Sequence, residues 1–436
     1  MPPFDLALVL VALLGAANLL PRPLYRLLVF LTLTAQLILI GPHWQIAPAY
    51  LALALTLLPT RRTKLLAASA ILLCCASLAL LWALPLFKLP PPTGPYAVGT
   101  TGPLTWTDTT RSLNGDPATS GRRRELPVQI WYPAPASATG ERARYARFRE
   151  LSLGHSYESV IRTNSILRAP IAAGPFPVLI FGHRWAGSRT QDTFLIEDLA
   201  SHGYVVIAAD HPLNAARAIL ADGSVLKSDR ADALTNLEGS SAPAIEALWL
   251  HELNLWVADD EFLLTTLFAE AAFANKLDPT RIGAFGHSFG GAAATALLGR
   301  DPRVKSAVNL DGWTFQALDT RTHEPILLLY EGSGEIRLPP HGVEGALDTA
   351  DFTAIDTSLR RFGGLRAFVA GTQHLDFTDQ TLTSPLRRLT FTGPIPGPRI
   401  RAITRSLVLG FFNQTLRGEG SIPAYPEVKM ERFPPS

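Results

Sequence analysis

A serine framed by glycines, lying between a predicted strand and a predicted helix, is the feature that most constrains this chain. Gly286-His-Ser-Phe-Gly290 follows the apolar stretch Arg281–Phe285 and precedes a stretch rich in Ala and Leu. A turn this tight leaves the flanking positions almost no room for a side chain. It presents Ser288 above the start of the helix, where the dipole and free backbone N–H groups favour negative charge. The strand and helix around the motif, more than its five letters, predict a nucleophile at Ser288.

A nucleophilic serine needs a base, and three histidines follow it in the chain. In hydrolases with such a turn the order is serine, acid, histidine. His374 comes directly after Leu365–Gly371, a predicted strand that ends in a glycine turn. His323 precedes the predicted strand Ile326–Tyr330 and so lies at the wrong end of the sheet, and His341 has no apolar strand before it. We therefore expect His374 to be the base.

Two acids compete to orient that base. Asp311 ends the predicted strand Val304–Leu310, and Glu331 ends the predicted strand Ile326–Tyr330. Both occupy carboxyl ends of strands, where the active sites of open parallel sheets are built. Position alone does not choose between the two.

An oxyanion hole is expected from two backbone N–H groups. One belongs to the residue after the nucleophile, which is Phe289. The other comes from a loop after an earlier strand, and Gly182–Gly187 follows the apolar strand Phe176–Phe181. Trp185 is the predicted second donor. Because His183 precedes the serine in the chain, we do not expect it to be the base. We expect it to shape this loop instead.

The remaining sequence alternates predicted strands and helices, which indicates a mostly parallel sheet with helices on both faces. The net charge is +2 without a long basic block, so nucleic acid is not expected as a partner. The cysteines are Cys74 and Cys75, and no Cys/His spacing typical of a metal site occurs. No metal or cofactor is therefore expected.

The first ninety residues are a different kind of sequence, with few charges among four apolar runs. A membrane span needs about 17–25 apolar residues. The first and fourth runs reach that length, and the second and third approach it only when extended to residues 24–41 and 44–59. We expect about four transmembrane helices, the alternative being two spans and a re-entrant hairpin. The runs are Phe4–Leu20, Leu27–Ile40, Ala47–Leu58 and Leu65–Phe87.

Basic residues in alternate loops predict the orientation. Arg22 and Arg26 separate the first two runs, and Arg61, Arg62 and Lys64 separate the last two. The positive-inside rule places both loops in the cytoplasm. Four crossings then put the rest of the chain on the periplasmic or extracellular side of a bacterial inner membrane.

Three regions follow from these patterns. We expect a transmembrane domain at residues 1–88, a Pro-rich linker at 89–95 and an α/β catalytic domain at 96–436. About 340 residues suit one large α/β domain with insertions.

The chain also resembles a known family along most of its length. From Gly94 to the C-terminus its motifs are similar to those of the platelet-activating factor acetylhydrolase family, plasma and bacterial type, close to the dienelactone-hydrolase-like α/β-hydrolases. The matching pieces are Gly94–Gly99, Leu126–Pro133, Phe181–His183, Leu199–His211, Gly286–Gly291, Leu310–Gly312 and His374 with Asp376-Phe377. The resemblance implies the α/β-hydrolase fold. It also favours Asp311 over Glu331, because the family's acid has this spacing from the serine. One departure is Arg184, where the family usually carries glycine after the histidine.

The function implied is that of a membrane-anchored serine esterase. Ser288, His374 and Asp311 would act through an acyl-enzyme. The family suggests a phospholipid with a short or oxidised sn-2 acyl chain as substrate. A general short-chain carboxylesterase, an acyltransferase and a catalytically silent membrane sensor stay open as alternatives.

Overall fold

A computed structural model of the chain describes residues 1–58, 64–115, 121–228, 242–315, 317, 323–332 and 342–434. Arg61, Arg62 and His341 lie outside these ranges. The contacts divide the chain into two compact units. The first comprises Met1–Lys88, Arg144–Thr163 and Thr381–Thr390, and the second comprises Leu89–Ala143, Asn164–Gln380 and Phe391–Ser436.

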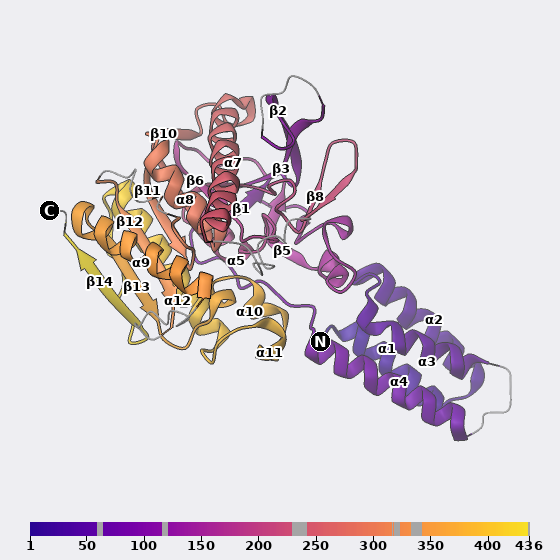
Figure 1. Ribbon diagram of the computed structural model, residues 1–436. Coiled ribbons are helices and arrows are strands. Elements are labelled where there is room, and N and C mark those ends of the chain that lie inside the picture. The colour runs from indigo at the N-terminus through magenta and orange to yellow at the C-terminus, as the bar shows by residue number, and fades with distance from the viewer. Residues whose placement is uncertain are drawn as a thin grey trace. The chain divides into compact units, whose positions relative to one another are not determined.

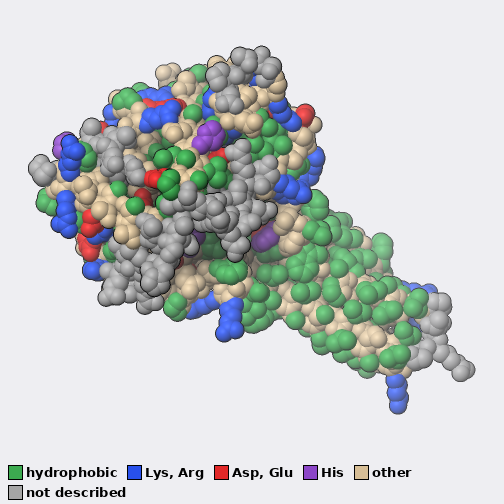
Figure 2. All heavy atoms as spheres, in the orientation of Figure 1, with side chains coloured by type: hydrophobic (Ala, Val, Ile, Leu, Met, Phe, Trp, Pro, Cys, Tyr) green, Lys and Arg blue, Asp and Glu red, His purple; other side chains and the backbone are tan. Residues whose placement is uncertain are grey.

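The first unit is built on four helices that pack against one another (Figure 1). They are α1 (Pro3–Ala16), α2 (Arg22–Leu39), α3 (Ala47–Leu57), which a 3₁₀ turn η1 (Trp44–Ile46) precedes, and α4 (Lys64–Ala83). Short helical turns of the same unit are η2 (Phe148–Glu150), η3 (Ser156–Val160) and α11 (Arg387–Thr390), and α10 (Gln380–Thr383) begins at the boundary. Apolar side chains also cover the outside of the four helices, as Figure 2 shows for one face. Leu10, Phe30, Leu51 and Leu72, one from each helix, are all more than half exposed.

Helix lengths correct one sequence prediction. Only α2 and α4, among the described residues, are long and apolar enough to cross a membrane. The first apolar run was expected to span, but α1 has 14 residues, about 21 Å at 1.5 Å per residue, against about 30 Å of hydrocarbon. The helix stops because Asn18 takes a left-handed φ of 56° and Pro21 follows shortly afterwards.

Polar side chains inside the first unit satisfy one another. Asp5 receives hydrogen bonds from Gln36 Nε2 and His43 Nε2, each at 3.2 Å. Tyr50 donates its hydroxyl to Gln36 Oε1 at 2.6 Å. A charged residue in an apolar helix is costly unless it is paired in this way. The network therefore explains how Asp5 can be fully buried in α1.

The second unit is organised around one large sheet. Twelve strands of the described chain form it, in the order β14-β13-β12-β11-β10-β6-β7-β3-β1-β5-β4, with β2 paired to β3. The strands from β7 to β13 in this order are parallel, and β14 and β3 flank them antiparallel. The bounds are β1 (Ala97–Thr100), β2 (Leu104–Ser112), β3 (Arg123–Ala134), β4 (Arg142–Arg144), β5 (Arg162–Leu167), β6 (Phe176–Gly182), β7 (Val205–Ala209), β10 (Leu277–His287), β11 (Val304–Leu310), β12 (Ile326–Glu331), β13 (Gly364–Val369) and β14 (Val428–Phe433). A separate hairpin joins β8 (Arg217–Ile219) and β9 (Val225–Lys227).

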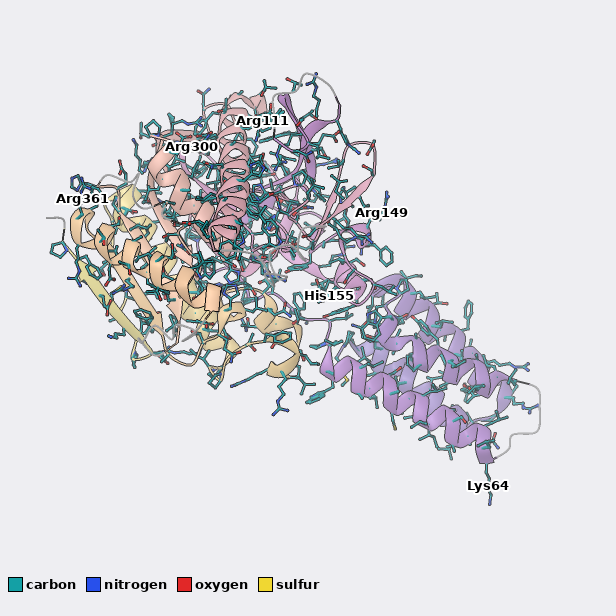
Figure 3. All side chains as sticks on the ribbon, in the orientation of Figure 1. Lys64, Arg111, Arg149, His155, Arg300 and Arg361 are labelled. Atoms are coloured by element: carbon teal, nitrogen blue, oxygen red, sulfur yellow. The ribbon has the colours of Figure 1, made fainter. Side chains whose placement is uncertain are left out.

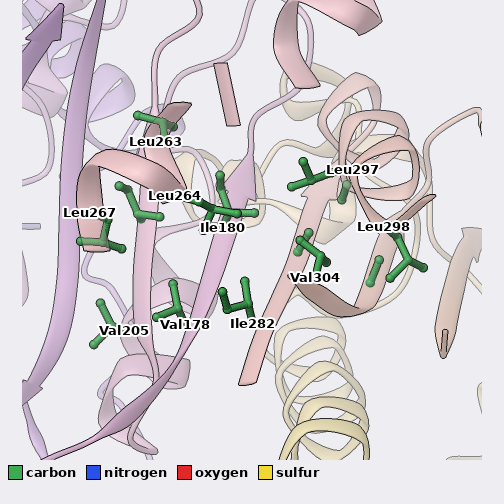
Figure 4. Packing of buried hydrophobic residues seen from close by; sticks show 14 of the residues in the cluster. Val178, Ile180, Val205, Leu263, Leu264, Leu267, Ile282, Leu297, Leu298 and Val304 are labelled. Carbon is green, nitrogen blue, oxygen red and sulfur yellow. The ribbon is translucent and has the colours of Figure 1, made fainter. Parts of the chain in front are cut away.

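Helices cover both faces of the sheet, which gives the α/β-hydrolase fold expected from the sequence. Leucines of α7 (Ala242–Ala269) and α8 (Phe289–Arg300) pack on one face, with α9 (Gly342–Phe362) beside them. Val178, Ile180 and Ile282 contribute to this cluster (Figure 4). The opposite face carries α5 (Thr193–Ser201) and α12 (Gly397–Phe412), followed by the π-helical turn Asn413–Arg417. The 3₁₀ turns η4 (Ala271–Phe273) and η6 (His374–Phe377) complete the unit.

A buried ion pair ties β3 to α7. Two nitrogens of Arg124 donate to the two carboxylate oxygens of Asp259 at 2.5 and 2.6 Å, and both residues are almost fully buried. Arg111 Nη2 and His211 Nδ1 also contact this carboxylate, at 2.9 and 2.8 Å. Burial raises the pKa of Asp259, but Arg124 and His211 outweigh it and hold that pKa below its usual range.

We expect Arg124→Ala to lower the free energy of unfolding by about 3–5 kcal/mol, because it leaves Asp259 buried with part of its charge uncompensated. Urea unfolding of the full chain, followed by the signal of the second unit, measures this. Arg300→Ala is the matched control. Arg300 pairs with Glu261 at 3.0 Å on the surface, so its loss should cost less than about 1 kcal/mol. Arg111 of the buried cluster and Arg300 are marked in Figure 3. Equal losses for the two variants would contradict this prediction.

Candidate active site

Ser288 occupies a strained turn between β10 and α8. Its φ is 56° and its ψ is −122°, a backbone conformation that a non-glycine residue adopts rarely. The Ser288 N–H donates to Leu310 O at 2.8 Å, and the carbonyl of Ser288 accepts the first bonds of the helix. This is the geometry of the nucleophile elbow that the sequence predicted.

The glycines of the motif are explained by close backbone packing. A Cβ on Gly286 would lie 2.2 Å from Gly290 O. A Cβ on Gly290 would lie 2.1 Å from Gly182 O, at the end of β6. Since real Cβ contacts are never this short, the elbow forms only with glycine at both positions.

Two backbone N–H groups near the elbow are available to an oxyanion. The N–H of Phe289 is at the start of α8, and that of Trp185 lies in the loop after β6. Neither has an acceptor among the residues that the structure describes. The two side chains are neighbours, with ring centroids 5.2 Å apart. These features support both predicted donors, whose role stays a prediction.

His183 shapes the loop that carries Trp185. It is fully buried, and its Nδ1 donates to the carbonyl of Arg184 at 2.6 Å. Its Nε2 accepts the backbone N–H of His211 at 3.3 Å. Burial and the neighbouring His211 lower the pKa of His183 well below its ordinary value. A neutral ring with one donor and one acceptor can hold both loops at once.

The predicted base and acid are brought together. His374 Nδ1 donates to Asp311 Oδ2 at 2.7 Å, and the contact joins η6 to the end of β11. The side chain of His374 is 43% exposed, while that of Asp311 is 9% exposed. The imidazole of His374 is therefore open to solvent, while the carboxylate of Asp311 is mostly covered. Among the described atoms, no hydrogen bond links Ser288 to His374. Such bonds are often long in unliganded enzymes.

Glu331, the competing acid, does not contact the imidazole in this arrangement. Its backbone N–H donates to the second oxygen of Asp311, Oδ1, at 2.9 Å. Of the two competing acids, Asp311 is therefore the one that the structure places on the imidazole.

Sequence reasoning did not single out His287, the variable residue before Ser288. It is fully buried, and its Nε2 donates to the carbonyl oxygen of His374 at 2.7 Å. Burial and the nearby His374 lower the pKa of His287 well below its ordinary value, so the ring is neutral. His374 lies 87 residues after His287, and no local sequence pattern predicts the contact between them.

Aromatic side chains line one side of the elbow. Phe289 contacts Trp185, Trp256 and Phe315, with ring centroids 5.0–5.7 Å apart. Trp313, two residues after Asp311, continues the series through Phe315 at 5.5 Å. This side of the elbow is therefore apolar and aromatic.

Comparison with known proteins adds the family. The model of the family described as platelet-activating factor acetylhydrolase, isoform II, matches residues 85–232 and 243–334, more than half of the chain. The chain belongs to this family. The match includes the loop after β6, the elbow at Ser288, Asp311 and Glu331, but ends before His374.

Curated relatives of the platelet-activating factor acetylhydrolase family are similar over shorter stretches. A probable 1-alkyl-2-acetylglycerophosphocholine esterase of Arthroderma benhamiae is 28% identical, over 31% of this chain and 31% of its own length. The platelet-activating factor acetylhydrolase of Cavia porcellus is 25% identical, over 52% of this chain and 56% of its own length. The chain thus spans from about a third to just over half of the length of these relatives.

A solved structure matches over a larger part. It is a ferulic acid esterase from Streptomyces cinnamoneus, 26% identical, with a TM-score of 0.64. The match covers 79% of this chain and 99% of that chain. The sheet and its helices are therefore those of an esterase fold.

Proposed function

We propose that the chain is a membrane-anchored serine esterase that acts through an acyl-enzyme. The observation that carries the proposal is the hydrogen bond between Asp311 and His374 beside the strained Ser288. Family membership and the esterase fold support it.

In this proposal Ser288 Oγ attacks the ester carbonyl and His374 Nε2 takes its proton. Nδ1–H of His374 points at Asp311, which fixes the tautomer and stabilises the imidazolium. The N–H groups of Phe289 and Trp185 receive the oxyanion. His374 then gives the proton to the departing alkoxide. Water next attacks the acyl-enzyme, with His374 again taking and returning a proton, and the carboxylic acid product is released.

Labelling with a fluorophosphonate ester tests the proposal directly. We expect stoichiometric phosphonylation of the full chain, blocked by Ser288→Ala. An inert wild-type protein would favour a silent sensor. Product analysis with and without an added alcohol separates hydrolysis from acyl transfer.

The proposed substrate is a phospholipid with a short or oxidised sn-2 acyl chain. The names of the relatives support this class, and an anchored enzyme would meet such lipids at the bilayer. We expect turnover of p-nitrophenyl esters to fall steeply with acyl length. A flat series from two to sixteen carbons would contradict a short-acyl site.

A second candidate is an esterase for aromatic acyl groups. The aromatic wall of Trp185, Phe289, Phe315 and Trp313 favours it, because flat rings stack well on such surfaces. The neighbouring structure is a ferulic acid esterase. Comparing kcat/KM for methyl ferulate and for a 2-acetyl phospholipid distinguishes the candidates.

Membrane anchoring by the four helices is the remaining part of the proposal. Large apolar side chains cover the outside of all four, and a soluble protein seldom exposes so continuous a patch. Two helices are long enough to span, and two are shorter. We propose that all four lie in the inner membrane, with the basic residues Arg22, Arg26 and Lys64 on the cytoplasmic side.

This orientation predicts the outcome of reporter fusions. α4 begins at Lys64 on the cytoplasmic side and is long enough to cross once, which places Ser288 outside the cytoplasm, so alkaline phosphatase fused after Pro95 should be active. The same reporter fused after Lys64 should be inactive, because that loop carries positive charge. An inactive fusion at Pro95 with an active one at Lys64 would overturn the location and leave the esterase chemistry untouched.

A further inference from the structure

One side chain, that of Gln191 just before α5, connects segments that carry three parts of the proposed site. We propose that Gln191 is a positioning residue which, together with His287, holds the loop of the oxyanion donor Trp185 in register with the loop of the base His374. The inference rests on the proposed esterase function and extends it to a residue outside the triad.

The contacts of Gln191 form a chain across the site. Its Oε1 accepts the backbone N–H of Arg184, the residue before Trp185, at 3.2 Å. Its Nε2 donates to His287 Nδ1 at 3.4 Å. His287, which ends β10, in turn donates from Nε2 to the carbonyl oxygen of His374 at 2.7 Å. The chain of hydrogen bonds thus runs from the oxyanion loop, past the elbow, to the base.

Only one assignment of donors and acceptors fits these contacts. The carbonyl of His374 can only accept, so His287 Nε2 carries the proton and Nδ1 is a bare acceptor. The group that faces this Nδ1 must therefore be the amide nitrogen of Gln191. The backbone N–H of Arg184 can only donate, so it requires the amide oxygen. Both ends demand the same orientation of the Gln191 amide. A neutral His287 agrees with this, because burial lowers its pKa well below the ordinary value.

The contact with Arg184 bears on the oxyanion donor. The carbonyl of Arg184 and the N–H of Trp185 belong to one planar peptide unit, in which they point in opposite directions. His183 Nδ1 donates to this carbonyl at 2.6 Å, and the backbone N–H of Gly187 does so at 2.8 Å. Gln191 holds the N–H on the other side of Arg184. With both of its peptide groups engaged, Arg184 has little freedom to turn the Trp185 N–H away.

The main chain of Gln191 is tied to the segment of the base as well. Its carbonyl accepts the backbone N–H of Asp379, shortly after η6, at 2.9 Å. The Asp379 carboxylate accepts the backbone N–H groups of Thr193 and Phe194 at 2.8 and 3.1 Å. These bonds satisfy free N–H groups in the first turn of α5 and fix the place from which the Gln191 side chain departs.

The proposed reaction needs the oxyanion donors and the base in place around Ser288 at the same time. A displacement of about 1 Å in either group can cost on the order of 10² in rate. The donor Trp185 and the base His374 lie on separate segments of the chain, so their alignment depends on contacts such as those of Gln191. Loss of these contacts should therefore slow turnover and leave ground-state binding of the substrate unchanged.

The test compares kcat and KM of p-nitrophenyl acetate hydrolysis by the full chain in detergent. Gln191→Met keeps the approximate length of the side chain and removes both of its hydrogen bonds. We expect kcat to fall by about 10–100-fold, with KM within about twofold of wild type.

The matched control is Gln129→Met. Gln129 is a buried glutamine of β3, which two strands separate from β10, and its Nε2 donates to Thr100 Oγ1 at 3.0 Å. This variant also loses a hydrogen bond of a glutamine, but it should leave kcat within about twofold of the wild-type value.

A double-mutant cycle tests the link through His287. His287→Gln keeps an amide nitrogen close to the position of Nε2 for the His374 carbonyl, and removes the acceptor for Gln191. In this background Gln191→Met should cost at least about threefold less in kcat than in the wild type, since residues of one hydrogen-bonded network do not act additively. Equal costs in both backgrounds would overturn the inference.

An unchanged kcat in Gln191→Met would likewise refute it. If that variant does not fold, Gln191→Asn decides, because its amide is one methylene shorter and cannot reach Arg184 and His287 together. A wild-type kcat in Gln191→Asn then counts against the inference, and a fall in kcat with KM unchanged supports it. A wild-type protein that neither cleaves esters nor reacts with fluorophosphonate would refute the proposed function instead.

Discussion

Ser288→Ala is expected to lower ester turnover about a million-fold, the usual cost of removing the nucleophile of a catalytic triad. The substitution removes only Oγ. Alanine must take the same left-handed φ of 56° as the serine it replaces, so the strain in the folded state is similar. The residual rate should be that of the oxyanion donors and of substrate binding alone.

Two measurements accompany this prediction. Turnover of p-nitrophenyl acetate gives the loss, and the midpoint of thermal unfolding shows whether the fold persists. Ser306→Ala is a matched control, since it removes a buried hydroxyl from β11 without touching the site. A Ser288→Ala variant that retains even a tenth of wild-type activity would refute the nucleophile assignment.

The sheet and the elbow could be predicted from the sequence because their signals are local. The Gly-x-Ser-x-Gly turn lies between an apolar strand and an Ala-rich helix. At each of its glycines, an added Cβ would come within 3 Å of another backbone atom. The order of serine, acid and histidine along the chain pointed to His374 in the same way. The α/β fold followed from the alternation of strands and helices.

Other features depend on contacts that no local pattern reveals. Position in the sequence left Asp311 and Glu331 equivalent, because both end parallel strands. What separates them is the hydrogen bond that Asp311 makes with His374, which lies 63 residues later in the chain. The partnership of His287 with His374 was missed for the same reason.

The helical unit shows a different limit. Apolar composition predicted spans well enough to identify the region, but the length of a helix depends on where its ends fall. Asn18, with its left-handed backbone, ends the first helix earlier than the apolar run suggested. A prediction from apolar composition does not detect the effect of one such residue on the length of the helix.

The second large effect is expected for Asp311→Asn, which should lower turnover by about 10⁴. Asparagine accepts the left-handed backbone that Asp311 adopts, with φ 57°, so the loop should keep its course. Its amide oxygen can still accept the Glu331 N–H. The amide nitrogen then faces His374 Nδ1 and cannot accept a proton from it, so the wrong tautomer of His374 is favoured.

Comparison with Glu331→Gln makes this result decisive. That change leaves the Asp311–His374 hydrogen bond in place and removes only an exposed neighbouring charge, so turnover should fall by no more than about tenfold. The ratio between the two variants is therefore expected to be about a thousand. If the ranking were reversed, the acid of the proposed triad would be Glu331, and the loop of His374 would have to turn toward β12 when substrate binds. The pKa of Glu331 is raised to about 7, so measuring kcat for both variants above pH 8 keeps titration of Glu331 out of the comparison.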